Sequence, residues 1–182
     1  MDKLVRVLAL ALMLVCAGAS IDRNARANTI TQLDNIDMNG PDAVSYTFFS
    51  VTTAGTFNIS ADGLPVYTLA DPQIFLFTDD GSLGGALTGT FIATDNDSGP
   101  GLNSLIANQF LNLGNYVVAV GAHVLLEPNA RMDSNETSSA GTVLVSIASE
   151  QGVANLQQVP EPASFLLVGF GLLGLRFVRR RG

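Results

Sequence analysis

The sequence contains very little cysteine. Its single cysteine, Cys16, lies in an apolar run near the N-terminus, so a mature chain without that run has no thiol. Disulfide bonds, thiolate zinc sites and cysteine catalysis are then excluded. Because no disulfide pattern can indicate the compartment, that information has to come from targeting signals.

Basic residues are almost absent between the two ends of the chain. From Asn28 to Gln158 the only one is Arg131, against thirteen acidic residues, which gives this stretch a formal charge of −12, whereas the whole chain has −7. Proteins that bind nucleic acids neutralise phosphates with a basic patch, so we expect no nucleic-acid partner. The negative charge favours cation uptake and repels anionic surfaces.

Histidine is equally scarce, which limits the catalytic chemistry. The segment Asp97-Ser98-Gly99-Pro100 is similar to the serine region of trypsin-like proteases, but that chemistry needs a histidine base. The single histidine, His123, lies downstream of the serine, whereas that family places it upstream, so we interpret it as an ordinary strand-end residue. A pair of catalytic carboxylates of the glycosidase type stays an open alternative among the thirteen acidic residues, although the sequence context singles out no particular pair. We predict no catalytic residues.

The chain begins with an apolar targeting segment. Lys3 and Arg6 precede an apolar run from Val7 to Ala17, and small residues follow it. This is the three-part pattern of a secretory signal peptide, and a buried amphipathic helix does not fit because the run is apolar on every face. We predict a signal peptide over residues 1–27 and therefore an exported protein.

Two positions have the spacing of small residues that signal peptidase recognises. One is Ala17-Gly18-Ala19, and the other is Ala25-Arg26-Ala27, which ends where strand-like sequence begins. We favour cleavage after Ala27, with Ala25 and Ala27 as the recognised residues. Cleavage after Ala19 stays open.

The C-terminal segment is a second apolar run. Residues 163–178 would span roughly 24 Å as a helix, slightly less than a hydrocarbon core of about 30 Å. Arg176 near the end of this run can reach the headgroups. The terminal arginines Arg179, Arg180 and Arg181 form a basic stop that would stay in the cytoplasm. We predict a transmembrane helix with the folded domain outside the membrane.

Within this run, Gly169-Phe170-Gly171-Leu172-Leu173-Gly174 has the spacing of a dinucleotide-binding fingerprint. A cofactor site would need this motif inside a long βαβ unit, with an acidic residue further along. Only a few residues follow Gly174, and none is acidic. We interpret these glycines as small residues of a membrane helix, which allow close helix approach.

The order of these features resembles a known sorting signal. The residues Val159, Pro160, Glu161 and Pro162 precede the short glycine-rich apolar run, and the arginine cluster ends the chain. This arrangement resembles the PEP-CTERM protein-sorting signal over residues 159–182. The resemblance implies that an exosortase, a membrane protease, recognises Pro160, Glu161 and Pro162 and removes the tail. It also implies a Gram-negative bacterium, and bacteria with this signal often make exopolysaccharide and biofilm. A permanent single-span anchor is the alternative.

Between the two ends, the sequence is typical of strands and turns. Several short segments show period-two alternation or enrichment in β-branched and aromatic residues, and no segment has sustained helical periodicity. The candidate strands cover residues 44–49, 55–60, 73–78, 89–93, 104–111, 115–120 and 142–147. We predict an all-β sandwich of jelly-roll type over residues 28–148.

Three further segments of this region are expected as follows. The run at residues 73–78 suits a strand covered on both faces. Residues 127–141 read as a long polar surface loop, and residues 149–158 as a linker to the sorting signal. The core should contain the aromatic residues Phe48, Phe57, Phe75, Phe77, Phe91, Phe110 and Tyr116.

Part of this domain has a second resemblance. A strand pair is followed by residues 71–81, by the turn Asp95-Asn96-Asp97 and by the strand-like residues 113–120. This order resembles bacterial pre-peptidase C-terminal-type domains over residues 55–120. The resemblance implies a non-catalytic sandwich attached to secreted or surface proteins, some of which bind calcium or polymers. The family has Asn-Asp-Asp where this chain has Asp95-Asn96-Asp97.

One metal site has a physical basis in the sequence. Calcium prefers six to eight oxygen ligands on a tight loop, and Asp95 and Asp97 alternate before Gly99, with Asp71 in a neighbouring loop. The alternative is an ordinary turn, in which these residue types tolerate the dihedral angles. We carry Asp71, Asp95 and Asp97 forward as candidate calcium ligands.

These features predict a non-catalytic surface or matrix protein. Signal peptidase and exosortase would process it, the C-terminal helix would hold it in the membrane transiently, and the sandwich would be a structural or binding module for exopolysaccharide. The alternative is a small secreted hydrolase or lyase that acts on polysaccharide with acidic residues.

Overall fold

The computed structural model describes residues 27–38, 43–81, 86–134 and 139–157. The predicted signal peptide up to residue 26, the sorting motif, the apolar C-terminal run and the basic stop lie outside these residues. No helix in the described part of the chain is long and apolar enough to cross a membrane. The elements are β1 (Asn28–Ile36), β2 (Val44–Thr53), β3 (Gly55–Asp62), β4 (Pro72–Thr78), β5 (Phe91–Asp95), β6 (Ser104–Leu111), β7 (Gly114–Ala122), α2 (Glu127–Met132), β8 (Gly141–Ser149) and β9 (Val153–Leu156).

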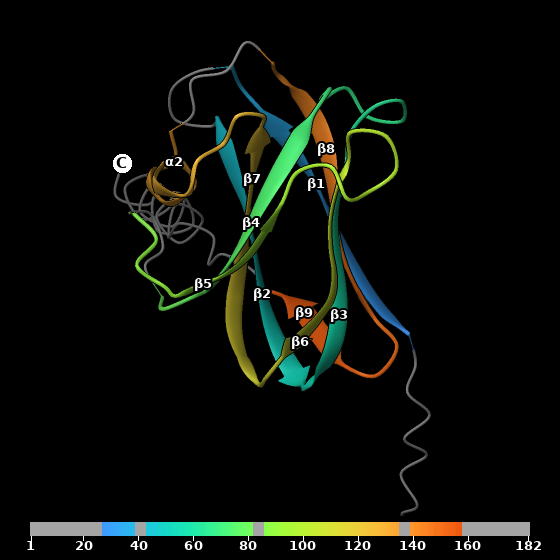
Figure 1. Ribbon diagram of the computed structural model, residues 1–182. Helices are drawn as coiled ribbons and strands as arrows, with labels where there is room; N and C mark the ends of the chain where they lie inside the picture. Colours follow the sequence, from blue (N-terminus) through green and yellow to red (C-terminus); the bar gives the residue numbers. More distant parts are fainter. Residues whose placement is uncertain (1–26, 39–42, 82–85, 135–138, 158–182) are drawn as a thin grey trace, which may run out of the picture.

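The strands form two antiparallel sheets, as Figure 1 shows. Sheet A has the order β1-β8-β3-β6, and sheet B has the order β5-β4-β7-β2-β9. Consecutive strands lie in different sheets except for β4 and β5, which pair directly. The prediction of an all-β domain with two packed sheets is confirmed.

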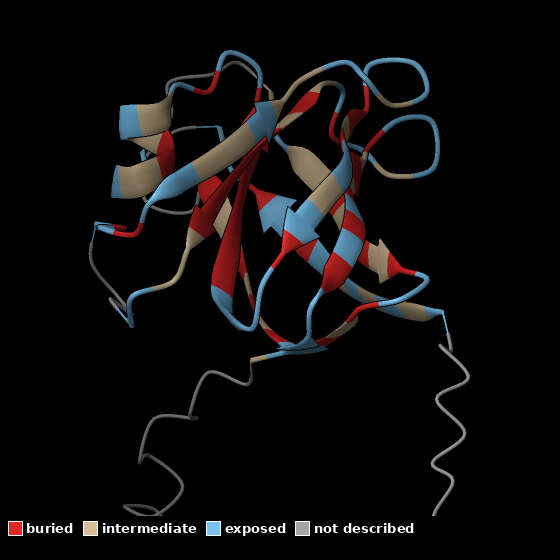
Figure 2. Cartoon of the chain, turned by 60° about the horizontal axis from the view of Figure 1, so that its bottom comes forward, coloured by how far each residue is buried: buried red, intermediate tan, exposed pale blue. Residues whose placement is uncertain are grey.

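The main core lies between the two sheets. In β3 buried residues alternate with exposed or half-buried ones from Gly55 onward, which is the pattern predicted for this segment. The inward-facing side chains of both sheets join in one apolar cluster, and Figure 2 shows buried residues along the strands of both sheets. Its largest fully buried members include Phe49, Phe57, Ile59, Ile74 and Ile147.

Sheet B is covered on its other face as well. In β4 the residues Ile74 to Phe77 are all buried, as expected for a strand between two layers. The outward-facing side chains belong to a second apolar cluster, which includes Phe75, Phe77 and Val117 from the sheet and Leu125 and Ala130 from the segment around α2. The short helix therefore closes a second, smaller core.

Two of the expected core aromatics are in fact exposed. Phe110 is 58% exposed because β6 places it opposite Thr56, whose side chain also faces solvent. Phe91 is 39% exposed on the edge strand β5, where its ring contacts Phe75 and Phe77 from one side. The prediction was wrong for these two, because β-propensity does not indicate which face of a strand is buried.

The expected polar loop at residues 127–141 begins with helix α2. Pro128 occupies the start of the helix, where a missing N–H is harmless, and Glu127 and Arg131 form an i,i+4 ion pair of 2.9 Å. Asp133 closes the helix in the left-handed region, with φ of 51°. A helix of this length gives almost no periodic signal, so the sequence prediction missed it.

Tertiary contacts hold α2 against sheet B. The guanidinium of Arg131 lies 4.3 Å from the centre of the Phe77 ring and donates to the carbonyl oxygens of Leu87 and Gly89. The Tyr46 hydroxyl donates to the carbonyl oxygen of Ala130 at 2.8 Å and accepts from the amide of Asp133 at 2.9 Å. These contacts stabilise a helix that would be too short to form alone.

The segment expected as a linker contains β9, which extends sheet B. Its residues pair with β2, from Phe49 opposite Leu156 to Thr53 opposite Val153. Gln157 follows the strand and donates from its backbone to the carbonyl oxygen of Phe48 at 2.9 Å. The folded domain therefore continues to the residue before the C-terminal segment.

Replacement of Tyr46 by phenylalanine should destabilise the protein by about 1–3 kcal/mol, because the Ala130 carbonyl loses its hydroxyl donor and the Asp133 amide keeps only the Asn129 carbonyl oxygen as acceptor. Burial, reinforced by the charge of Asp133, raises the pKa of Tyr46 to about 12. The tyrosine contribution should thus be complete below about pH 10 and disappear as the pH rises through 12.

Urea unfolding between neutral pH and pH 12 measures this difference, with Tyr67→Phe as the control, because Tyr67 is a half-buried tyrosine in the turn region between β3 and β4, away from α2. A Tyr46→Phe protein as stable as the wild type at neutral pH would contradict the role given to this hydroxyl.

Candidate functional site

The three predicted calcium ligands lie at one end of sheet B. Asp71 precedes β4 and Asp95 ends β5, and the two strands pair with Ile74 opposite Asp95. His123 follows β7 at the same end, where its backbone amide donates to the Asp71 carbonyl oxygen at 2.9 Å. The topology thus brings Asp71 near the Asp95–Gly99 turn, as expected.

The carboxylate of Asp95 is engaged in holding its own turn. One oxygen accepts from the amide of Ser98 at 3.1 Å and from the amide of Leu105 at 2.7 Å. The buried hydroxyl of Ser104 lies within hydrogen-bonding distance of the Pro72, Asp95 and Asn96 carbonyl oxygens. These bonds support the turn interpretation for Asp95.

A close backbone approach also defines this turn. The amide of Gly99 donates to the carbonyl oxygen of Asn103 at 2.8 Å, and a Cβ at Gly99 would lie 2.6 Å from that oxygen. Asn103 in turn accepts through its side chain from the amide of Gly63 at 2.9 Å. The turn is therefore tied to the chain that leaves β3.

Asp71 has a different environment. Its Oδ1 atom is buried and has no hydrogen-bond partner. Burial raises the pKa of Asp71 above its usual range; the nearby His123 opposes this effect and the charge of Asp97 adds to it. The described residues hold no group of three or more acidic, histidine or cysteine side chains at metal-ligand spacing. Calcium binding by Asp71, Asp95 and Asp97 stays a prediction.

The variant Asp71→Asn tests whether Asp71 binds calcium and whether burial disfavours its charged carboxylate. Because the raised pKa means that the fold disfavours the charged carboxylate, the variant should be more stable than the wild type at neutral pH in chelator. This advantage should disappear near and below pH 3.8, where the wild-type carboxyl is also neutral. Thermal melts in chelator and in calcium measure both effects.

A calcium site would raise the melting temperature of the wild type but not that of Asp71→Asn. An unchanged midpoint of the wild type at saturating calcium would contradict the metal hypothesis. A variant less stable than the wild type in chelator would contradict the burial argument.

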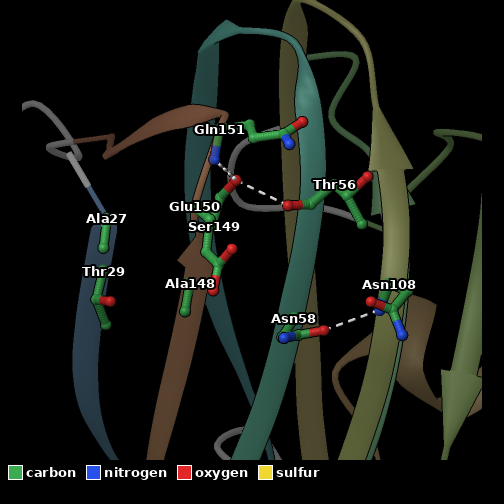
Figure 3. Close-up of a pocket in the computed structure, with 9 residues that line it drawn as sticks. All are labelled: Ala27, Thr29, Thr56, Asn58, Asn108, Ala148, Ser149, Glu150 and Gln151. Carbon is green, nitrogen blue, oxygen red and sulfur yellow. Dashed lines mark hydrogen bonds between the residues drawn. The ribbon is translucent and has the colours of Figure 1, made fainter. Parts of the chain in front are cut away.

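A groove lies on the outer face of sheet A, away from the main core. It has a volume of about 510 Å³, and Figure 3 shows its lining from β1, β3, β6, β8 and the turn after β8. Thr29 and Asn58 flank Ala148, which pairs with both across the sheet. The lining residues are Ala27, Thr29, Thr56, Asn58, Asn108, Ala148, Ser149, Glu150 and Gln151.

Ser149 places the turn that forms one end of the groove. Its hydroxyl donates to the Thr56 carbonyl oxygen at 2.7 Å and accepts from the amides of Gln151 and Gly152 at 3.2 and 2.7 Å. A Cβ at Gly152 would lie 2.4 Å from the Phe57 ring, so the turn packs directly on the core. Glu150 and Gln151 are therefore held at the rim.

A β-bulge shapes the opposite wall. The register between β3 and β6 shifts between Phe57 and Ile59, and Asn108 adopts the left-handed region with φ of 55°. The side-chain oxygen of Asn58 accepts from the amide of Asn108 at 2.8 Å. Asparagine tolerates this conformation better than most residues.

Apart from Ala27, the groove residues carry no sequence signal that marks them as functional. Each is an ordinary polar or small residue, and only strand register brings them together. Ala27, the expected cleavage position, lines the groove immediately before β1, so cleavage after it would leave this strand intact. Ala25 lies outside the described residues, and the signal peptide stays a prediction.

The described residues thus define an all-β protein with two packed sheets. Residues 158–181 match the family model of the PEP-CTERM protein-sorting motif, which includes the predicted Val159–Pro162 and Arg179–Arg181. The chain therefore carries a PEP-CTERM sorting signal, which marks a protein exported and sorted by an exosortase in Gram-negative bacteria and anchored through its C-terminal region. This resemblance is confirmed.

The other comparisons add little. No curated protein matches the chain. A solved structure of infectious bursal disease virus, Gt strain, aligns over 81% of this chain and 47% of its own at 11% identity, with a TM-score of 0.17. A score this low carries no argument about fold or function. The resemblance to pre-peptidase C-terminal-type domains stays a prediction.

Proposed function

We propose that this protein is a non-catalytic component of the cell surface or extracellular matrix. Exosortase would remove its C-terminal tail at or near Pro160–Pro162, and the β-sandwich would then serve as a structural or binding module associated with exopolysaccharide. The observation that carries this proposal is the PEP-CTERM motif at residues 158–181, which directly follows the folded domain.

The junction between domain and motif supports processing next to the fold. Gln157 is the last described residue, and its backbone and side chain donate to the carbonyl oxygens of Phe48 and Phe49. Removal of a tail that begins beyond Gln157 would leave β9 in sheet B. The mature product would then be the sandwich alone, without a remaining membrane segment.

The strand order supports assignment of the sandwich to the jelly-roll type. The strands β1, β8, β3 and β6 form one sheet, and β2, β7, β4 and β5 are adjacent in the other, with β9 added beside β2. Eight strands wound alternately into two antiparallel sheets characterise this fold. Jelly rolls occur in many binding and structural proteins, so the fold does not by itself indicate catalysis.

The acidic side chains near the groove favour binding over hydrolysis. Glycoside hydrolysis generally uses two carboxyl groups about 5–10 Å apart across the scissile bond. Among the described residues that line the groove, Glu150 is the only acid. Asp95, at the other candidate site, uses its carboxylate to hold backbone amides.

Mass spectrometry of the protein from the matrix tests the sorting proposal. We expect a product that begins at Asn28 and ends near Pro160–Pro162. Glu161→Ala should retain the tail and accumulate in the membrane fraction, whereas Asp37→Asn, an exposed acid in the sandwich, should be processed normally. Intact Arg179–Arg181 in the matrix form would instead indicate a permanent anchor.

Incubation of the exported protein with fluorescently labelled exopolysaccharide fragments tests the non-catalytic proposal. We expect the fragments to bind and to keep their length. New shorter products, absent when Glu150→Gln protein is used, would favour the alternative of a polysaccharide hydrolase or lyase.

A further inference from the structure

We propose that the groove on the outer face of sheet A binds a short stretch of an uncharged polysaccharide. This inference rests on the proposed function, because it gives the binding module a site and a class of ligand. On sheet B, the cluster around α2 packs on the outer side of β4, β7 and the start of β2. In sheet A the outward-facing Thr29, Thr56 and Asn58 are exposed, and they line the groove.

The Asn58 amide has a fixed orientation in this groove. A backbone N–H can only donate, so the atom that faces the Asn108 amide at 2.8 Å must be the Asn58 side-chain oxygen. The Nδ2 group therefore points the other way, and Figure 3 shows it on the side of Ala148. The protein thus presents a pre-oriented donor on the side of the small Ala148 side chain.

The remaining polar groups of the groove suit hydroxyl-rich ligands. Hydroxyl and amide side chains both donate and accept hydrogen bonds, as sugar hydroxyl groups do. The groove offers such groups on Thr29, Thr56, Asn108 and Gln151. Its volume of about 510 Å³ lies within the roughly 300–1,000 Å³ of small-ligand sites.

An exposed aromatic ring lies beside these polar groups. Phe110 pairs with Thr56 across β3 and β6, so both side chains project from the same face of sheet A. The Phe110 ring is 58% exposed. Ligand sites combine apolar or aromatic surface with a few placed polar groups, and a sugar ring presents both an apolar C–H face and hydroxyl groups.

The charges around the groove select against anionic polymers. No lysine or arginine is among its lining residues, and its one charged member is the acid Glu150. The stretch from Asn28 to Gln158 has a formal charge of −12. Polysaccharides with carboxylate, sulfate or phosphate groups would therefore be repelled, whereas an uncharged chain would not.

Calorimetric titration of the exported, mature protein tests this assignment. The probes are neutral gluco- and galacto-oligosaccharides, with oligogalacturonate as the anionic comparison. Asn58→Asp keeps the oxygen that accepts from Asn108 but removes the donor, so the fold should keep its unfolding midpoint. Affinity for the neutral oligosaccharide should fall roughly two- to tenfold, as for one lost hydrogen bond.

A matched pair of variants on β1 provides the control. Thr29→Val removes a hydroxyl from the groove, whereas Thr31→Val removes one from the next outward-facing position of the same strand. We expect weaker binding, again by roughly two- to tenfold, only for Thr29→Val. Phe110→Ala should also weaken binding without unfolding the protein, because the ring is exposed.

The outcomes separate this inference from the proposed function. Neutral oligosaccharide bound equally well by all variants would overturn the groove assignment and leave the binding module in place. Binding of oligogalacturonate alone would overturn the uncharged class. Binding of neither would overturn the groove and the polysaccharide role together, while the mass of the mature protein would still decide the sorting proposal.

Discussion

The two sheets differ on their outer faces, because within the described residues only sheet B carries a packed layer around α2. The guanidinium of Arg131 holds this layer together. It lies over the Phe77 ring, donates to the carbonyl oxygens of Leu87 and Gly89, and pairs with Glu127. The backbone of Arg131 also accepts from the amide of Leu87 at 2.8 Å. One residue thus joins helix α2, the segment before β5 and the outer face of sheet B, so that this face is buried while that of sheet A stays open.

A strand or helix could be predicted from the sequence when its hydrophobic pattern lies within one segment of the chain. The alternation in β3 and the apolar run of β4 predicted their strands and even their burial, because these patterns lie within a single segment. Helix α2 was missed because its stability comes from contacts with Tyr46, Phe77 and Leu87, which are distant in the sequence. β9 was missed because its four residues are too few to show a period-two alternation.

The sorting motif and the groove differ in the same way, because the motif is local in the sequence and the groove is assembled from several strands. The sorting motif could be recognised because Val159–Pro162, an apolar run and the arginines follow one another along the chain. The acids at Asp71, Asp95 and Asp97 were also noticed for their local spacing, but Asp95 serves the turn itself. The groove draws its lining from β1, β3, β6 and β8, so its residues acquire a common environment only through strand register.

The packing of Arg131 against sheet B affects the charge of the protein surface. Arg131 is the one basic residue between Asn28 and Gln158, and its guanidinium is used in the contacts of α2. Among the described residues no other lysine or arginine is present to attract anions, so the acidic residues dominate the charge of this part of the chain. If the proposed function holds, association with a polymer matrix would use hydrogen bonds and apolar contact rather than opposite charge. Under the proposed groove assignment, the open polar face on sheet A would supply the first of these contacts and the exposed Phe110 ring the second.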